Sequence, residues 1–235
     1  MKKFTLLIIA SLSISFGFSQ ITSTSSGGNW SATSTWIGGV VPTADSDVII
    51  NGTVYHDNKS DQCRNLTVNI EKTLTALNVK MTGWPLKILG DLINNGNIQN
   101  NENNRFQISV NGNITNNGIL SNYGISLRGD SDQTISGTEP FASYFLQMEN
   151  ENNAIAGSDI RFLGTSLLFY KNNGFIVEPG ITVSLNYSDA QIQGDFMPPT
   201  NRAHGVHFTG GGTVYIGSKY NIDESNFEGV TSTKE

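Results

Sequence analysis

Carboxylates and histidines are the side chains of this chain that could perform acid–base chemistry, such as cleavage of a glycosidic bond. Hydrolysis of that bond requires two carboxyl groups, about 5 to 5.5 Å apart for retention or about 6.5 to 9.5 Å apart for inversion. A lyase requires a base, often Arg or Lys, beside carboxylates that can bind calcium. Most acids stand in turn-like segments, where turn capping is the simpler interpretation, so the sequence leans against an enzyme. The candidate catalytic residues are Asp130, Asp132, Asp195, His204 and His207.

The two C-terminal histidines make a poor metal site. His204 and His207 are three residues apart, so their rings would point to opposite faces of a strand unless Gly205 bends the chain. The segment around them is similar to the Gly-His-Gly element of pectin-degrading hydrolases, but the other catalytic elements of those enzymes are missing. No cofactor is expected, but Asp45 and Asp47 would share one side of an extended segment, which leaves a structural calcium ion open as an alternative to turn capping.

Aromatic and basic side chains are the candidates for binding a ligand without turnover. Trp30 and Trp36 would stack on sugar rings if they were exposed, but a hydrophobic cap at one end of the domain explains both their pairing and their position. Arginines that lined one flank would recognise an acidic sugar, whereas isolated solvated charges are the simpler interpretation. These arginines are Arg105, Arg128, Arg161 and Arg202.

The elements that must position these side chains are repeats of one pattern. The segment 84–122 matches itself when it is shifted so that Leu86 falls on Ile108, and a self-match at one fixed offset is typical of stacked structural repeats. Large apolar residues alternate with polar ones within each copy, and this alternation predicts a strand with one buried face. Glycines and paired asparagines mark the corners, because they accept left-handed backbone angles. The same shift also matches Ile88 with Val110, Leu92 with Ile114 and Ile98 with Leu120.

Strands and corners that alternate over laps of about 20 residues predict an all-β solenoid. One lap buries too few side chains to be stable alone, so neighbouring laps must complete its backbone ladders and its core. The Asn-Asn-Gly triplet at 94–96 matches the one at 116–118, and stacked asparagines can form an amide ladder. A third triplet at 172–174 is out of step with this offset. Either the laps change length or this triplet lies at a different corner.

The chain divides into four predicted segments. Residues 1–19 have the basic start, the apolar stretch and the small-residue cleavage site, near Ser19, of a secretory signal peptide. Residues 20–28 are rich in Ser, Thr and Gly and are expected to form a flexible linker. The β-solenoid domain would cover 29–217, followed by a polar tail at 218–235 that leaves truncation of the chain open. No stretch after the leader is apolar for long enough to predict a transmembrane helix, so we expect a secreted or cell-surface protein.

Charge and cysteine content exclude several classes of function. The net charge of −6 argues against nucleic acid as a partner, because binding of phosphates requires a basic face. Cys63 is the only cysteine, so no disulfide can form within the chain, and we expect a small buried apolar side chain there. No zinc-binding spacing, phosphate-binding glycine loop or Ser-His-Asp arrangement is present in the sequence.

Three segments resemble a known family. The segment GNWSATSTWIGGVVPTADSDVIINGTV at 28–54 resembles the N-terminal part of secreted right-handed β-helix surface proteins of gliding Gram-negative bacteria. It is more distantly similar to the eight-glycine extracellular domain. The segments QCRNLTVNIEKTLTAL with LKILGDLINNGNI, and SDQTISGTEPFASYFLQMENEN, are similar to later parts of the same bacterial proteins. The resemblance implies a single-stranded right-handed parallel β-helix, pectin-lyase-like in its architecture, with an N-terminal Trp-containing cap.

The expected function is that of an exported structural or adhesive module at the cell surface. Its partners would be polysaccharides or cell-surface glycans, held by repeated weak contacts and not cleaved. The candidate binding residues are Trp30, Trp36, Arg128 and Arg161. Two alternatives remain open from the sequence: a polysaccharide lyase or glycoside hydrolase of the β-helix type, and a spacer or stalk fragment of a larger surface protein.

Overall fold

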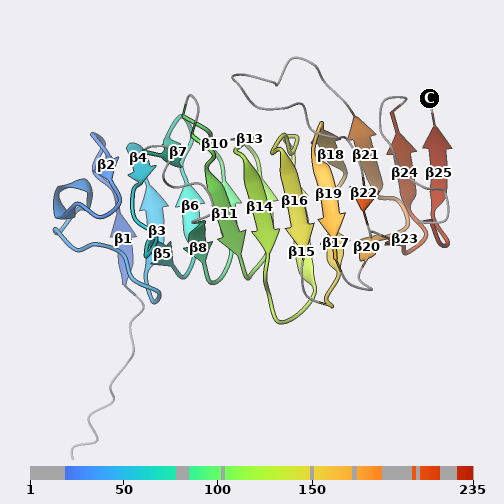
Figure 1. Ribbon diagram of the computed structural model, residues 1–235, viewed down its shortest axis with the longest axis horizontal. Helices are drawn as coiled ribbons and strands as arrows, with labels where there is room; N and C mark the ends of the chain where they lie inside the picture. Colours follow the sequence, from blue (N-terminus) through green and yellow to red (C-terminus); the bar gives the residue numbers. More distant parts are fainter. Residues whose placement is uncertain are drawn as a thin grey trace, which may run out of the picture.

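The computed structural model describes residues 19–77, 85–101, 104–148, 151–170, 174–186, 203–204, 207–217 and 227–234. Within these ranges the protein consists of β-strands and connecting turns, with one short 3₁₀ helix, η1 (Thr33–Thr35). All pairings between named strands are parallel. The strands stack along the long axis of the molecule, from β1 and β2 at one end to β25 at the other (Figure 1).

The strands form three long faces, here called sheets I, II and III. Sheet I has the order β1 (Gln20–Thr22), β3 (Asp47–Ile50), β6 (Leu66–Val68), β9 (Leu92–Asn94), β12 (Ile114–Asn116), β15 (Gln133–Gly137), β17 (Ala154–Ala156), β20 (Gly174–Val177) and β23 (His207–Thr209). Sheet II has the order β5 (Gln62–Cys63), β8 (Leu86–Ile88), β11 (Gln107–Val110), β14 (Gly124–Leu127), β16 (Phe145–Met148), β19 (Ser166–Phe169) and β22 (Ala203–His204).

Sheet III consists of two groups of strands. The first group is β2 (Gly28–Asn29), β4 (Thr53–His56), β7 (Thr73–Ala76), β10 (Asn97–Gln99) and β13 (Ile119–Ser121). The second group is β18 (Ile160–Leu163), β21 (Thr182–Asn186), β24 (Thr213–Ile216) and β25 (Thr231–Lys234). Single parallel bridges from Leu120 to Phe141 and from Phe141 to Phe162 connect the two groups.

From β3 to β14, successive strands visit sheets I, III and II in strict order, and we call each such circuit a lap. The order continues to β24, with the bridge of Phe141 in place of a sheet III strand in one lap. Each lap therefore adds one parallel strand to each face, except that the lap of Phe141 adds a single bridge to sheet III. This all-β architecture of long parallel sheets is compatible with the predicted β-helix solenoid.

The repeat predicted from the sequence is confirmed by the strand register. Ile108 pairs with Leu86 and Val110 with Ile88 in sheet II. In sheet I, Leu92 pairs with Ile114 at the predicted offset, whereas Ile114 pairs with Ile135 in the next lap, which is therefore shorter. The third triplet also lies at a different corner: Gly174 begins its sheet I strand, whereas Asn94 and Asn116 end theirs. Its two asparagines lie outside the described residues.

One continuous core runs through the laps. Inward-facing residues of sheet I lie above one another in register, and Ile88 and Val110 of sheet II belong to the same buried cluster. Because each strand exposes its other face, the burial pattern alternates along most strands. The stacked residues of sheet I are Val48, Leu66, Leu92, Ile114, Ile135, Ala156 and Val177.

The predicted amide ladder is present inside this core. Asn94 and Asn116 are fully buried, and Asn94 Nδ2 donates to Asn116 Oδ1 across 2.8 Å. Asn116 Nδ2 in turn donates to the carbonyl oxygens of Glu139 and Pro140 in the following lap. Buried amides of this kind must be hydrogen-bonded to avoid a desolvation cost, so the ladder holds three successive laps in register.

The N-terminal end of the described chain differs from the prediction. Residues 20–28 were expected as a flexible linker, but Gln20–Thr22 form β1, which pairs with β3, and Gly28 begins β2, which pairs with β4. The segment is ordered because its backbone groups bond to the neighbouring strands, which its polar composition does not reveal. The predicted signal peptide lies outside the described residues, apart from Ser19.

The C-terminal end of the described chain also differs from the prediction. Residues 218–235 were expected as a polar tail, yet Thr231–Lys234 form β25, which pairs in register with β24 and extends sheet III. Phe227 forms a parallel bridge with Phe208 and stacks on its ring, with the centroids 5.4 Å apart. The apolar contact and the backbone ladder explain why this polar segment joins the fold.

Candidate ligand-binding groove

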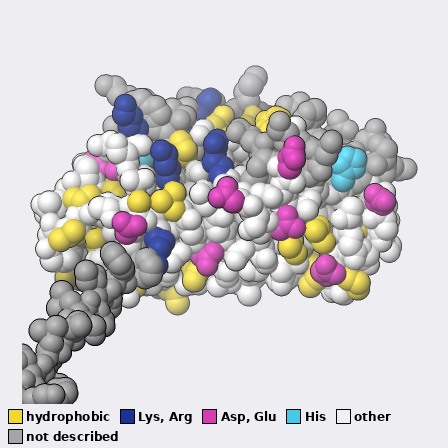
Figure 2. Space-filling model, turned by 90° about the horizontal axis from the view of Figure 1, so that it is seen from below, with side chains coloured by type: hydrophobic (Ala, Val, Ile, Leu, Met, Phe, Trp, Pro, Cys, Tyr) yellow, Lys and Arg dark blue, Asp and Glu magenta, His cyan; other side chains and the backbone are white. Residues whose placement is uncertain are grey.

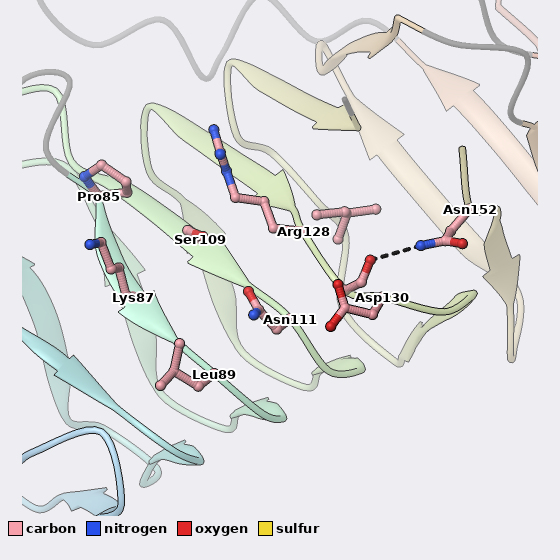
Figure 3. Close-up of a pocket in the computed structure, with 10 residues that line it drawn as sticks. Pro85, Lys87, Leu89, Ser109, Asn111, Arg128, Asp130 and Asn152 are labelled. Atoms are coloured by element: carbon pink, nitrogen blue, oxygen red, sulfur yellow. Dashed lines mark hydrogen bonds between the residues drawn. The ribbon is translucent and has the colours of Figure 1, made fainter. Parts of the chain in front are cut away.

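A groove of about 800 Å³ runs over the outer face of sheet II (Figure 3). It spans the strands β8, β11 and β14 and the turn that follows β14. Its size lies within the range typical of ligand-binding clefts, about 300 to 1,000 Å³. The lining residues are Pro85, Lys87, Leu89, Ser109, Asn111, Leu127, Arg128, Gly129, Asp130 and Asn152.

The strand pattern explains why polar side chains face the groove. Lys87 lies between the buried residues Leu86 and Ile88 on β8, so its side chain points outward. Ser109 occupies the matching position on β11, because the register pairs it with Lys87. The sequence repeat thus places one polar side chain above another along the outer face.

A second row of groove-lining residues lies where these strands end. The Asn111 N–H donates to the carbonyl of Ile88, and the Arg128 N–H donates to the carbonyl of Val110, so the ladder continues past each strand. Leu89, Asn111 and Arg128 are therefore neighbours in successive laps. Beyond them, Asn152 Nδ2 donates to the carbonyl oxygen of Gly129 at 2.8 Å and fixes the turn at one end of the groove.

The charges of the groove differ from those of the whole chain. Its lining contains two cations, Lys87 and Arg128, and one carboxylate, Asp130, whereas the chain carries a net charge of −6. All three residues are exposed. On the face seen in Figure 2, the acidic side chains are spread singly over the surface, while most of the basic ones gather toward one half.

The structure brings together two of the predicted site residues, Arg128 and Asp130, and separates the others. Asp132 is exposed, but its Oδ1 accepts two hydrogen bonds from Asn153. One comes from the backbone N–H, at 2.7 Å, and the other from the side-chain Nδ2. This carboxylate therefore caps the backbone of the next lap, in agreement with the turn-capping role that is the simpler interpretation of acids in turns. Asp195 lies outside the described residues.

The two histidines belong to different sheets. His204 ends β22 and pairs with Leu168 in sheet II, whereas the exposed His207 begins β23 and pairs with Gly174 in sheet I. Arg161 is exposed on β18 in sheet III and lies on a different face from Arg128. Arg161 and Arg128 therefore do not line one flank together, because they occupy different faces of the lap.

The aspartates proposed for calcium are also accounted for. Asp47 accepts hydrogen bonds from Arg64 Nε, at 2.9 Å, and from Asn65 Nδ2, at 2.8 Å, and forms an ion pair with the Arg64 guanidinium. The hydrogen bond from Arg64 is the main reason why the pKa of Asp47 lies below its usual value. Asp45 is exposed. The described residues contain no group of three His, Cys, Asp or Glu side chains that could hold a metal ion.

Several turn acids and amides share one structural role. Asn65 Oδ1 accepts from the backbone N–H of Asp91 at 2.8 Å, and Asp91 Oδ1 accepts from the N–H of Asn113 at 2.7 Å. Each of these residues stands just before a sheet I strand and caps its counterpart in the next lap. Stacking of successive laps thus explains why Asp and Asn occupy these turn positions.

Trp30 and Trp36 are inside the protein. Their exposed fractions are 0% and 2%, and their rings make an edge-to-face contact with centroids 5.1 Å apart. Trp36 Nε1 donates to the carbonyl of Trp30, whose N–H donates to the carbonyl of Tyr55. Neither ring presents a face to solvent, so these residues offer no stacking platform for a sugar.

Sequence reasoning did not identify a buried histidine–aspartate pair. His56 is fully buried, and its Nδ1 lies 2.9 Å from Asp61 Oδ2. The same oxygen accepts the backbone N–H groups of Asp57 and Asn58, so Asp61 closes the turn between β4 and β5. Because both side chains are buried, the pair serves to stabilise the turn.

A cluster of aromatic rings lies where the sheet II strands begin. Tyr123 and Tyr144 stack with centroids 5.1 Å apart, and the Arg105 guanidinium lies 4.9 Å from the Tyr123 centroid. The ring of Phe145 makes an edge contact with Tyr123 and covers Gly124, which has no side chain in the way. Arg105, another of the arginines considered for binding an acidic sugar, thus packs against this aromatic cluster.

Comparisons with known proteins do not assign this chain to a family: no protein-family model, no curated protein and no solved structure matches it. The described residues contain no helix that is both long and apolar enough to span a membrane.

Proposed function

We propose that this chain is an exported surface module that binds glycans or other surfaces without cleaving them. The observation that carries the proposal is the groove on sheet II, in which polar side chains recur from lap to lap around one carboxylate, Asp130. Hydroxyl, amide and charged groups are those that bind sugar hydroxyls, and exposed Leu89 offers an apolar surface to a sugar ring. Several such weak contacts along one polysaccharide molecule increase the overall affinity through multivalency.

The same geometry argues against hydrolysis. A glycoside hydrolase requires two carboxyl groups beside the bond that is cleaved. Among the residues that line the groove Asp130 is the single acid, and the nearby Asp132 is engaged with Asn153. Binding without turnover requires no second carboxylate.

We further propose that the chain is a single-stranded right-handed parallel β-helix whose first lap is capped by Trp30 and Trp36. The regular visits to three parallel sheets and the burial of both indoles at the N-terminal end support this fold. A first lap without a cap would expose its core and its strand edge, which invites aggregation. This architecture and the N-terminal sequence also support membership of the secreted bacterial surface proteins that the sequence resembles.

The predicted leader supports export, and its removal can be tested directly. The full-length chain, expressed in a Gram-negative host, is expected to lose the leader 1–19 and to leave the cytoplasm. Intact-mass measurement of the purified protein would identify the new N-terminus. An unprocessed chain that stays in the cytoplasm would contradict the proposal of export.

Glycan binding is tested by affinity electrophoresis of the purified chain 20–235 through gels containing plant, algal and animal polysaccharides. The expected result is retardation in at least one gel, with no new reducing ends and no new unsaturated products after long incubation. A variant with Lys87→Gln, Asn111→Ala and Arg128→Gln together is expected to migrate without retardation while keeping the unfolding temperature of the parent. Retardation that is unchanged in this variant would show that another surface binds the glycan.

A lyase is the second candidate, because Lys87 and Arg128 stand near Asp130 in one groove and a lyase base is often Lys or Arg. Unsaturated products that absorb in the ultraviolet, and that disappear with Arg128→Gln, would favour this alternative. The absence of both retardation and cleavage across the panel would leave the chain as a spacer between other surface domains.

A further inference from the structure

We infer that the groove on sheet II selects linear acidic polysaccharides, with Lys87 and Arg128 binding carboxylate or sulfate groups on alternate sugars. This inference rests on the proposed function and adds the chemical class of the ligand. Its basis is the excess of positive charge in the groove of an otherwise acidic chain. A neutral glycan can use the two exposed cations only as hydrogen-bond donors, whereas an acidic glycan is also attracted by their charge.

The spacing of the two cations is defined by the strand ladder. Lys87 lies on β8, β11 follows as the next strand, and Arg128 directly follows β14. Two steps between adjacent strands amount to about 9 to 10 Å, and Arg128 stands a further two positions along the strand direction, about 7 Å. The two backbone positions are therefore roughly 11 to 12 Å apart. This separation is longer than one sugar unit, so anionic groups on alternate sugars fit it better than groups on neighbouring sugars.

The groups between the two cations suit the uncharged parts of such a chain. Ser109 and Asn111 lie on the intervening lap and line the groove. Partly exposed Asn111 offers an amide to sugar hydroxyl groups, whereas Ser109 is only 5% exposed. Leu89, which is 42% exposed, provides an apolar contact for the face of a sugar ring beside them. The groove therefore presents charge, polar and apolar groups along the direction in which the laps stack.

The two cations have different roles. A guanidinium can bind a carboxylate or sulfate through two parallel hydrogen bonds, so Arg128 orients the anionic group that it binds. The Lys87 ammonium is a point charge on a flexible stem and accepts anions over a wider range of positions. Asp130, two residues beyond Arg128, repels a second anion at that end and accepts hydrogen bonds from hydroxyl groups instead.

The test uses the purified chain 20–235 and two matched pairs of polymers: alginate with its propylene glycol ester, and carboxymethyl cellulose with hydroxyethyl cellulose. Affinity electrophoresis in buffer with a chelator removes bridging calcium. The acidic member of at least one pair is expected to retard the chain at least tenfold more strongly than its neutral partner. Lys87→Gln and Arg128→Gln should each weaken that retardation about fivefold, the effect of one exposed ion pair. Raising the salt concentration should weaken it further.

Arg161→Gln is the matched control, because it removes another exposed arginine from a different sheet. It is expected to leave the retardation unchanged. Equal loss in Arg161→Gln and Arg128→Gln, or equal retardation by acidic and neutral partners, would overturn the acidic selectivity while leaving glycan binding intact. No retardation by any polymer, including the wider panel above, would instead overturn the proposed function itself.

Discussion

The Asn94 carboxamide donates a hydrogen bond to Asn116 Oδ1 of the next lap across 2.8 Å, and both side chains are fully buried. Beside this pair, Asn117 Nδ2 donates to Asn95 Oδ1 at 3.1 Å, but this second ladder lies at the surface. The two ladders have the same chemistry and the same lap spacing and differ in burial. They therefore provide an internal comparison of how much burial adds to an amide ladder.

Asn116→Ala is expected to destabilise the protein by about 2 to 4 kcal/mol, because Asn94 and two backbone carbonyls would lose a partner inside the core. The matched control, Asn117→Ala, removes an exposed amide from the adjacent position and should cost less than about 1 kcal/mol. Urea unfolding followed by circular dichroism measures both. Similar losses in the two variants would show that burial does not strengthen the ladder.

The core of the fold was predictable because its pattern is local. Leu86, Ile88, Ile108 and Val110 alternate with polar residues at a constant offset, and that alternation directly determines which side chains are buried. The strands β1 and β25 were not predictable in this way. Their residues are polar, and they become strands because neighbouring backbones offer hydrogen bonds, which no feature of their own sequence reveals.

The candidate site was predictable only in part, since its lining depends on the register between laps. Arg128 and Asp130 attracted notice as charged residues near a turn, but Lys87 did not, although all three line one groove. The offset of the sequence repeat already aligned Lys87 with Ser109 and could have identified that row. The next lap is shorter, because Val110 pairs with Leu127, so the position of Arg128 could not be derived from the repeat.

Gly124→Ala is expected to destabilise the aromatic cluster, because a methyl group there would meet the Phe145 ring at 2.0 Å. The ring must move away, which we expect to cost about 1 to 3 kcal/mol. In the double variant with Phe145→Ala the obstacle is gone, so the glycine substitution should cost much less than in the parent. Thermal unfolding of the four proteins gives this coupling, and strictly additive losses would show that the ring is not the obstacle.

Cys63 is expected to be inert in the folded protein. It is fully buried, and burial, assisted by the negative charge of Asp47, raises the pKa of its thiol. A chromogenic disulfide reagent at pH 8 should therefore react with less than one tenth of the protein in an hour without denaturant, and completely in concentrated guanidinium chloride. Rapid reaction of the native protein would mean that the laps around β5 open readily.

The ion pair of Asp47 with Arg64 gives a prediction for the pH dependence of stability. Because the folded pKa of Asp47 lies below its ordinary value of 3.8, the carboxylate stabilises the fold above that value. This contribution should be lost as the pH falls from about 4 through the lower folded pKa. The effect should stay below about 1 kcal/mol, because Asp47 is 34% exposed and solvent screens the pair.

Urea unfolding of the parent and of Asp47→Asn, between pH 6 and pH 2.5, measures this contribution. The two proteins should differ most at pH 6 and should converge as the pH falls through the lowered pKa of Asp47, where the parent carboxylate becomes protonated. Asp45→Asn is the matched control, since Asp45 is exposed two residues earlier and no ion pair joins it to a described residue. A constant difference between the parent and Asp47→Asn over the whole range would show that Asp47 acts through hydrogen bonds that do not depend on its charge.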